Sequence, residues 1–193
     1  MIVVKVGGSL YDHPRLGPGL RTYLDTLPEP VLLVPGGGEF ADAVRKLDAL
    51  HQLGEESSHW LALHAMNLAG EFLRQLGVKT PMIDALEICM QLPHSWDVTS
   101  DSIAAHVAIS LNASRLILLK SVDIPIGTSW AEAADRGWVD RHFPSIMANS
   151  QYGARRASKG EDPCLRVGLP PLTAPHALLV EIVNFREVLN EIQ

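Results

Sequence analysis

The alternation of short apolar runs with amphipathic segments constrains the fold of this chain most strongly. Clusters of apolar and β-branched residues predict buried strands at residues 2–6, 31–34, 116–119 and 178–183, with another strand around Ile88. Helical spacing of apolar residues predicts helices at residues 12–24, 39–53, 57–76, 99–111, 128–134, 140–147 and 186–192. Strands that alternate with helices form a mostly parallel sheet covered on both faces. We therefore predict an α/β fold, a three-layer sandwich around a mostly parallel central sheet.

The length of 193 residues allows one domain with a substantial core. The net charge of −6 argues against nucleic acids and anionic membranes as partners, because both need a clustered basic surface. Cys89 and Cys164 lack metal-binding spacing and fit small buried residues in a reducing compartment. Met1 runs directly into the first strand, and no apolar run approaches the roughly 20 residues that span a bilayer. We expect a cytoplasmic protein with a single domain over residues 1–193.

Two of the predicted strands end in glycines that lead into a helix. The first junction reads KVGGS from Lys5 to Ser9, and the second reads VPGGGE from Val34 to Glu39. Glycines let backbone N–H groups converge on an anion, and the following helix adds the positive end of its dipole. In open α/β sheets such sites gather at the carboxyl ends of the strands. We expect phosphate or substrate binding here, with a tight βα turn as the alternative; neither junction has the GxxxxGK[ST] or GxGxxG pattern.

Charged residues near the expected carboxyl edge of the sheet are candidates for the chemistry. A lysine inside a buried strand is costly unless its ammonium group meets an anion, so Lys5 is expected to reach a phosphate at the first glycine loop rather than extend to solvent. Asp101 lies at a helix start, where the helix dipole alone would favour a carboxylate. Lys120 and Asp123 follow a strand and point to the same edge, or are ordinary loop charges.

The remaining polar residues give weaker signals. His59, His64 and His106 fall within predicted helices and have no metal-binding spacing, so no metal site is predicted. Residues 149–164 are rich in Gly, Ser, Arg and Lys and are expected to form a mobile loop. Its basic residues, Arg155, Arg156 and Lys159, are either a solvated cluster or part of a lid over phosphates.

Four stretches in the same order and spacing resemble the amino acid kinase family, which includes uridylate, acetylglutamate and isopentenyl phosphate kinases. They are VVKVGGSL, VPGGGEFA, TSDSIAAHVA and LILLKSVD, and they cover about residues 1–123. The resemblance implies phosphoryl transfer from ATP, with Mg²⁺, to a small phosphate substrate, in a protein that forms homo-oligomers. It places acceptor binding in about residues 1–112 and nucleotide binding in about residues 113–193.

The resemblance also implies roles for individual residues. Lys5 and Asp101 would be catalytic. Phosphate or nucleotide contacts would come from the first glycine loop and the end of the third strand, namely Gly7, Gly8, Ser9, Lys120, Ser121 and Asp123. Acceptor contacts would come from the second glycine loop and the TSDS segment, namely Gly36, Gly37, Gly38, Thr99 and Ser100.

Three further stretches, PGGGEFADAVRKLD, SSHWLALHAMNLAGE and HSWDVTSDS, resemble the branch of that family that acts in methanofuran biosynthesis. This resemblance implies that the acceptor is an aminomethylfuran-methyl phosphate, converted to its diphosphate for a one-carbon coenzyme. The alternatives are a uridylate- or amino-acid-type kinase, or a non-catalytic member of the fold that binds a nucleotide or anion.

The sequence departs from the family in its nucleotide half. Family members continue from K-x-V-D into G-[IV]-[YF], whereas this chain continues from Asp123 into IPIG, where Pro125 restricts the backbone differently. The chain is also shorter in this half. No clear equivalent of the family's second catalytic lysine is present, and Lys159 or Arg156 could substitute for it.

Overall fold

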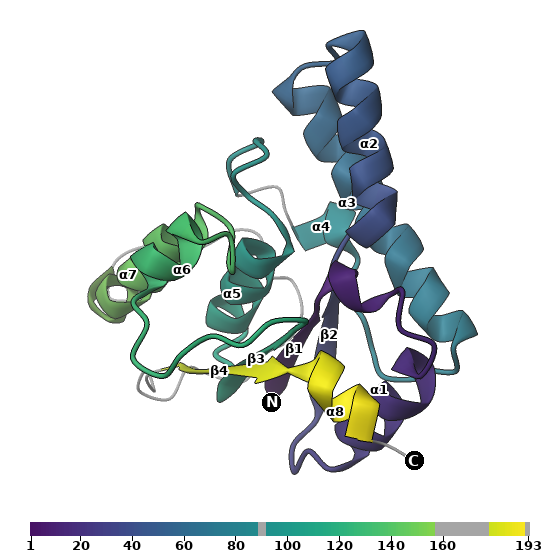
Figure 1. Ribbon diagram of the computed structural model, residues 1–193. Coiled ribbons are helices and arrows are strands. Elements are labelled where there is room, and N and C mark those ends of the chain that lie inside the picture. The colour runs from purple at the N-terminus through teal and green to yellow at the C-terminus, as the bar shows by residue number, and fades with distance from the viewer. Residues whose placement is uncertain (89–91, 157–177, 192–193) are drawn as a thin grey trace.

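The computed structural model describes residues 1–88, 92–156 and 178–191, and its centre is a four-stranded parallel sheet. The strands are β1 (Ile2–Val6), β2 (Val31–Pro35), β3 (Arg115–Lys120) and β4 (Leu179–Asn184), in the order β2-β1-β3-β4. All three pairings are parallel. Helices lie on both sides of the sheet (Figure 1). The predicted three-layer α/β fold is therefore confirmed.

Side-chain alternation along the strands divides the core into two clusters. Val3, Leu116 and Leu118 belong to the cluster formed with helices α5 (Ser100–Ser110), α6 (Trp130–Asp135) and α7 (Phe143–Arg156). The intervening strand residues, Val4 and Ile117 among them, pack instead with helices α1 (Leu16–Asp25) and α8 (Phe185–Glu191). Because neighbouring residues of a strand face opposite sides, each strand contributes to both clusters.

Two long helices extend from the carboxyl edge of the sheet as an antiparallel hairpin (Figure 1). They are α2 (Gly38–His51), which starts in the second glycine loop, and α3 (Glu55–Gln75). Left-handed backbone at Gln52 (φ 53°) ends α2, and Gly54 (φ 84°) precedes α3. The break between the predicted helices 39–53 and 57–76 is thus correct in place, but α3 begins at Glu55, two residues before its predicted start.

Shorter elements complete the fold. A 3-10 helix, η1 (Gly8–Leu10), follows the first glycine loop, so the helix predicted from residue 12 begins only at Leu16. The segment around Ile88, predicted as a strand, is instead helix α4 (Ala85–Ile88). Its start is capped, because the side chain of Asn67 accepts from the amide of Ala85 and the carboxylate of Asp84 accepts from the amide of Leu86. Such local hydrogen bonds favour a helix start over an extended chain.

The prediction of a mobile loop at residues 149–164 is wrong for residues 149–156. Helix α7 continues through Arg156. The amide of Phe143 donates to Asp140 at the start of this helix, and Phe143 and Ile146 fix it to the core. Residues 157–164 lie outside the described part of the chain, as do Cys89, Cys164 and Lys159. None of the described helices combines the length and apolar character needed to cross a membrane.

Candidate active site

The two glycine loops leave adjacent parallel strands and pack directly against each other. A Cβ atom on Gly8 would lie 2.3 Å from the backbone N and Cα of Gly38. A Cβ on Gly36 would lie 2.8 Å from the amide nitrogen of Gly8, and Gly38 itself has a positive φ of 52°. These glycines are therefore required for the close approach of the loops, whether or not a ligand is bound. The first amides of α2 have no acceptors within the helix, so they are available to an anion.

We expect Gly8→Ala to destabilise the protein by about 1–3 kcal/mol, because the added methyl group meets backbone that cannot move aside. Urea unfolding followed by circular dichroism measures the change. Gly70→Ala is the matched control: Gly70 lies within α3, where the new Cβ would sit 3.3 Å from the ring of Pro35. Alanine is also the better helix former, so this variant should stay within about 1 kcal/mol of wild type. Equal stability of the two variants would contradict the steric account.

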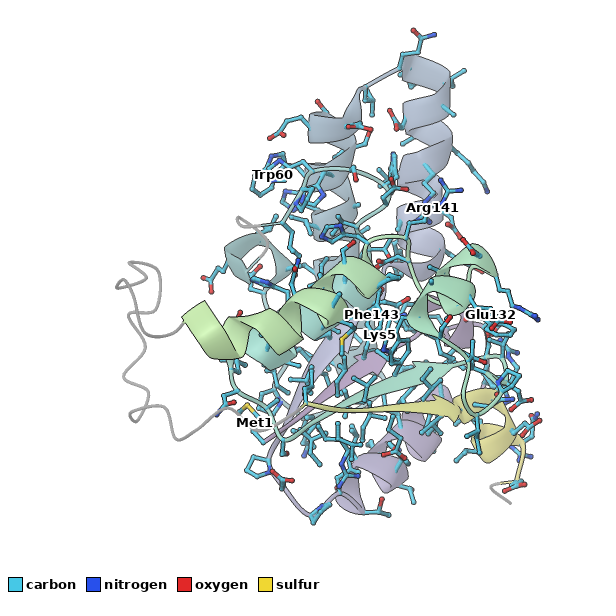
Figure 2. The ribbon with its side chains drawn as sticks, turned by 90° about the vertical axis from the view of Figure 1, so that its left-hand side faces the viewer. Met1, Lys5, Trp60, Glu132, Arg141 and Phe143 are labelled. Carbon is cyan, nitrogen blue, oxygen red and sulfur yellow. The ribbon has the colours of Figure 1, made fainter. Side chains whose placement is uncertain are left out.

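Below the glycine loops, Lys5, Asp101 and Lys120 form a buried charge cluster. The Nζ of Lys5 lies 2.8 Å from Oδ1 of Asp101, and the Nζ of Lys120 lies 2.6 Å from Oδ2 of the same carboxylate. All three side chains are nearly inaccessible, and Figure 2 shows Lys5 within the body of the molecule. Two ammonium groups share one carboxylate, so these three residues together carry a net positive charge next to the glycine loops, which the carboxylate of Asp140 offsets in part.

The strand register explains why these residues meet. Lys5 follows Val3 by two residues and Lys120 follows Leu118 by two, so both lysines face the α5 side of the sheet. Lys5 is paired with Leu118 across the two strands, which places Lys120 two residues further toward the carboxyl edge. Asp101 is in the first turn of α5, the helix that covers this face. The structure therefore brings the two predicted catalytic residues together and adds Lys120 to them.

Burial and charge act in opposite directions on the carboxylate. Burial alone would raise the pKa of Asp101, but the ammonium groups of Lys5 and Lys120 outweigh it, and the pKa lies below its ordinary value. Burial, with repulsion from Lys5, lowers the pKa of Lys120 to about 8, although Asp101 opposes the change. At neutral pH Asp101 is thus a carboxylate and Lys120 is mostly protonated.

Asp140 fixes the start of α5, a role that no local pattern in the sequence indicated. Its carboxylate accepts hydrogen bonds from the amides of Thr99 and Ser102 and from both of their hydroxyl groups, at 2.5–3.0 Å. It also accepts from the amide of Phe143, so a single carboxylate holds the starts of α5 and α7 together. The hydroxyl of Thr99, predicted to bind the acceptor, is therefore already engaged. Asp140 was expected only to begin a helix.

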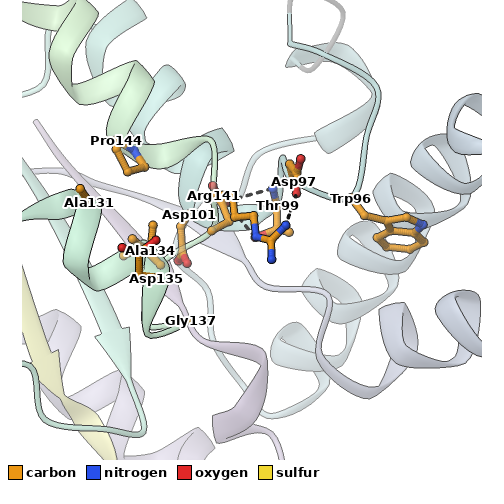
Figure 3. A pocket seen from close by; sticks show the side chains of 12 residues that line it. Trp96, Asp97, Thr99, Asp101, Ala131, Ala134, Asp135, Gly137, Arg141 and Pro144 are labelled. Atoms are coloured by element: carbon orange, nitrogen blue, oxygen red, sulfur yellow. Dashed lines mark hydrogen bonds and ion pairs between the residues drawn. The ribbon is translucent and has the colours of Figure 1, made fainter.

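A large open cavity of about 770 Å³ lies on the α6 and α7 side of the charge cluster. Figure 3 shows Asp101 and Thr99 at its centre, with Trp96 toward the α2–α3 hairpin and Ala131 and Asp135 on α6. Its other described lining residues are Asp97, Ala134, Gly137, Val139, Asp140, Arg141 and Pro144.

A second, smaller cavity of about 100 Å³ lies between the glycine loops, the hairpin and α5. Gly8, Gly37, Gly38 and Ser100 contribute polar backbone or hydroxyl groups. Most of its other described lining residues are apolar: Ala41, Ala62, Leu63, Met66, Val98 and Ile103. The larger polar or aromatic side chains are those of Arg45, His59 and Trp96, and Thr99 completes the lining. Trp96 and Thr99 line both cavities, so the two meet beside Asp101.

The other predicted site residues lie at the rim. The hydroxyls of Ser9 and Ser121 are 2.8 Å apart and join the first glycine loop to the end of β3. Arg186, which sequence reasoning missed, donates to the carbonyl of Ser9 and to the carboxylate of Asp12. Asp123 is exposed and lines neither cavity. Within residues 1–88, 92–156 and 178–191, no three His, Cys, Asp or Glu side chains gather as metal ligands would.

Comparison with known proteins identifies relatives of this chain. No family model matches the sequence. The chain is 33% identical over 144 residues to the [5-(aminomethyl)furan-3-yl]methyl phosphate kinase of Methanocaldococcus jannaschii, a match that covers 64% of this chain and 67% of the relative.

Solved structures of uridylate kinases share the fold. The enzyme from Archaeoglobus fulgidus has a TM-score of 0.54 at 18% identity and covers 78% of this chain and 87% of its own. The enzyme from Ureaplasma parvum has a TM-score of 0.51 at 14% identity, with coverages of 77% and 85%. Together with the curated relative, these structures confirm the resemblance read from the sequence. The chain belongs to the amino acid kinase family and is a phosphotransferase of that fold.

Proposed function

We propose that the protein transfers the γ-phosphoryl group of ATP to the phosphate of a small acceptor, across the Lys5–Asp101–Lys120 cluster. The observation that carries this proposal is the buried excess of positive charge. Two ammonium groups share one carboxylate at the carboxyl edge of the sheet. A buried unpaired charge is unfavourable, and a phosphoryl group placed there would supply the missing negative charge.

Phosphoryl transfer needs positioning and charge neutralisation more than covalent help from the protein. Lys5 and Lys120 would neutralise the oxygens of the transferring group, with the amides of the glycine loops as further donors. Asp101 would hold both ammonium groups in place rather than act as a base, because an acceptor phosphate is already a nucleophile. Lys120 thereby fills the place of the second lysine that the sequence did not reveal.

The two cavities support a division between donor and acceptor. The larger one is bounded by α6 and α7, in the half expected to bind the nucleotide. The smaller one is bounded by the second glycine loop and the hairpin, and also by Gly8, which was expected to contact the nucleotide phosphates. They meet beside Asp101, where an in-line transfer between two phosphates would take place. Mg²⁺ would enter with ATP, bound to its phosphates, since the described residues offer no carboxylate cluster for it.

For the acceptor we propose an aminomethylfuran-methyl phosphate, the substrate in the name of the relative. The smaller cavity, about 100 Å³, is below the roughly 150 Å³ of a cavity that takes benzene, so it could receive only the ring end of this acceptor, with the phosphate outside it at the glycine loops. The second candidate is uridylate, suggested by the names of the fold neighbours.

The test is ADP release in the presence of ATP, Mg²⁺ and one acceptor at a time. We expect release to depend on the furan phosphate and to stay at background with uridylate or without acceptor. ADP release with uridylate but not with the furan phosphate would make uridylate the acceptor. Failure to bind ATP at millimolar concentration would support the non-catalytic alternative.

The pH dependence of the reaction should report Lys120. Because the pKa of Lys120 is about 8, its ammonium form, which the proposed reaction needs, is lost as the pH rises through 8. We expect kcat/KM, which reflects the free enzyme, to fall above that pH. In Lys120→Arg the charge persists at every accessible pH, so the fall should disappear or move upward. An unchanged profile in this variant would assign the titration to another group.

A further inference from the structure

The two His-Trp stretches of the sequence, His59-Trp60 and His94-Ser95-Trp96, come together beside the smaller cavity. The rings of His59 and His94 stack at 4.3 Å between centroids, with 13° between their planes. The Nδ1 of His94 lies 2.5 Å from one carboxylate oxygen of Glu56, and the other oxygen accepts from the indole N–H of Trp60. The stack holds the ring of His59 against His94, which does not line the cavity.

His59 is buried, with 5% of its surface exposed, and lines this cavity. Its Nε2 is the one buried side-chain nitrogen in the described part of the chain that has no hydrogen-bond partner. A buried polar atom without a partner is rare in native proteins, because it costs free energy. A ligand in the cavity would provide the missing partner.

The hairpin places His59 at the end of the cavity remote from the glycines. On α2, Arg45 follows Gly38 by seven residues, which is a rise of about 10 Å. The antiparallel helix α3 contributes Met66 near the glycine end and His59, seven residues earlier, near Arg45. An acceptor whose phosphate lies at the glycine loops would therefore turn its opposite end toward His59.

Few side chains at that end can accept a hydrogen bond. Arg45 and the indole of Trp96 are donors only, and the indole N–H already donates to Asp48. Thr99 donates its hydroxyl proton to Asp140, and its oxygen is the other side-chain acceptor among these residues. Burial, with the nearby His94, lowers the pKa of His59, while Glu56 opposes the change. A neutral ring with its proton on Nδ1 leaves Nε2 as an acceptor.

We infer that His59 is the specificity-determining residue for the end of the acceptor opposite its phosphate, and that its Nε2 accepts a hydrogen bond from a primary amine there. This inference rests on the proposed function, which supplies an acceptor with an aminomethyl group. Carboxylates bound to the lining residues and to His94 offset the charge of Arg45 at this end: Asp42 pairs with Arg45, Asp48 binds Trp96, and Glu56 binds His94.

The test compares two acceptors in three proteins. The acceptors are the aminomethylfuran-methyl phosphate and its ethyl analogue, in which a methyl group replaces the amine. The proteins are wild type, His59→Phe, which keeps a ring to stack on His94, and His59→Gln, whose side-chain oxygen can still accept a hydrogen bond. Wild type should prefer the amine by about 10- to 100-fold in kcat/KM. The preference should vanish in His59→Phe and persist in part in His59→Gln.

Two controls separate this inference from a structural role and from the proposed function. His64→Phe replaces an exposed histidine of the same helix and should keep the full preference. If His59→Phe keeps the preference, or loses activity equally with both acceptors, the inference is wrong while the kinase function stands. If wild type does not discriminate between the acceptors, the inference is also wrong. This outcome needs only the wild-type protein, so it does not depend on whether a variant folds. If wild type phosphorylates neither acceptor, the proposed function itself fails.

Discussion

Lys5→Met is expected to lower kcat by about 10²–10³, since removal of one donor that stabilises charge in a transition state has an effect of this size. The fold should tolerate the change. Methionine has a similar length, and Asp101 keeps its contact with Lys120 at 2.6 Å. Steady-state kinetics with saturating ATP and acceptor measure the effect. The KM values should change much less than kcat, because Lys5 acts mainly on the transferring group.

Lys79→Met is the matched control for this prediction. Lys79 is exposed, follows α3, and lines neither cavity. Its replacement should leave kcat within about twofold of wild type, since surface substitutions away from special contacts have small effects. Turnover of Lys5→Met near the rate of this control would remove Lys5 from the reaction.

Asp101→Asn is expected to destabilise the protein and to abolish most of its activity. Without the carboxylate, two buried ammonium groups face each other uncompensated, and breaking a buried ion pair in this way costs about 3–5 kcal/mol. Urea unfolding at pH 7 measures the loss of stability. The loss should shrink as the pH rises toward 8 and stay constant above it. Without Asp101, which in wild type keeps the pKa of Lys120 as high as about 8, Lys120 becomes neutral at a lower pH in the variant.

Asp135→Asn provides the comparison. Asp135 lines the larger cavity but is exposed, so its replacement should change stability by no more than about 0.5 kcal/mol. If Asp101→Asn proves as stable as Asp135→Asn at pH 7, the carboxylate does not balance the two lysines, and the electrostatic account of the site is wrong.

Local patterns were sufficient to predict the parts of the site that depend on one segment. The run from Ile2 to Val6 with its following glycines specified a buried strand and a tight turn, and the lysine within it indicated a site. The parallel order of the strands then placed both glycine loops at one edge. These features follow from propensity and alternation, which act over a few residues.

Features that depend on contacts between distant segments could not be predicted. Lys120 meets Asp101 only because β3 pairs with β1 in one register, and a shift of one residue would turn the lysine to the other face. The stacking of His59 on His94 joins residues 35 apart through the packing of α3 against the segment before α5. At Ile88, apolar character suggested a strand, but Asn67, on another helix, accepts from the amide of Ala85 and donates to Asp84, and these bonds start a helix there.

The direct test of the central claim is to follow the phosphoryl group by ³¹P NMR, with wild type and Lys5→Met in parallel, ATP, Mg²⁺ and the aminomethylfuran-methyl phosphate. We predict that wild type converts the acceptor signal into the two coupled signals of a diphosphate while ADP accumulates. Lys5→Met should form the same product at least 100-fold more slowly. An acceptor signal that stays unchanged in wild type while ATP is bound, or that disappears equally fast with both proteins, would contradict phosphoryl transfer at the Lys5–Asp101–Lys120 cluster.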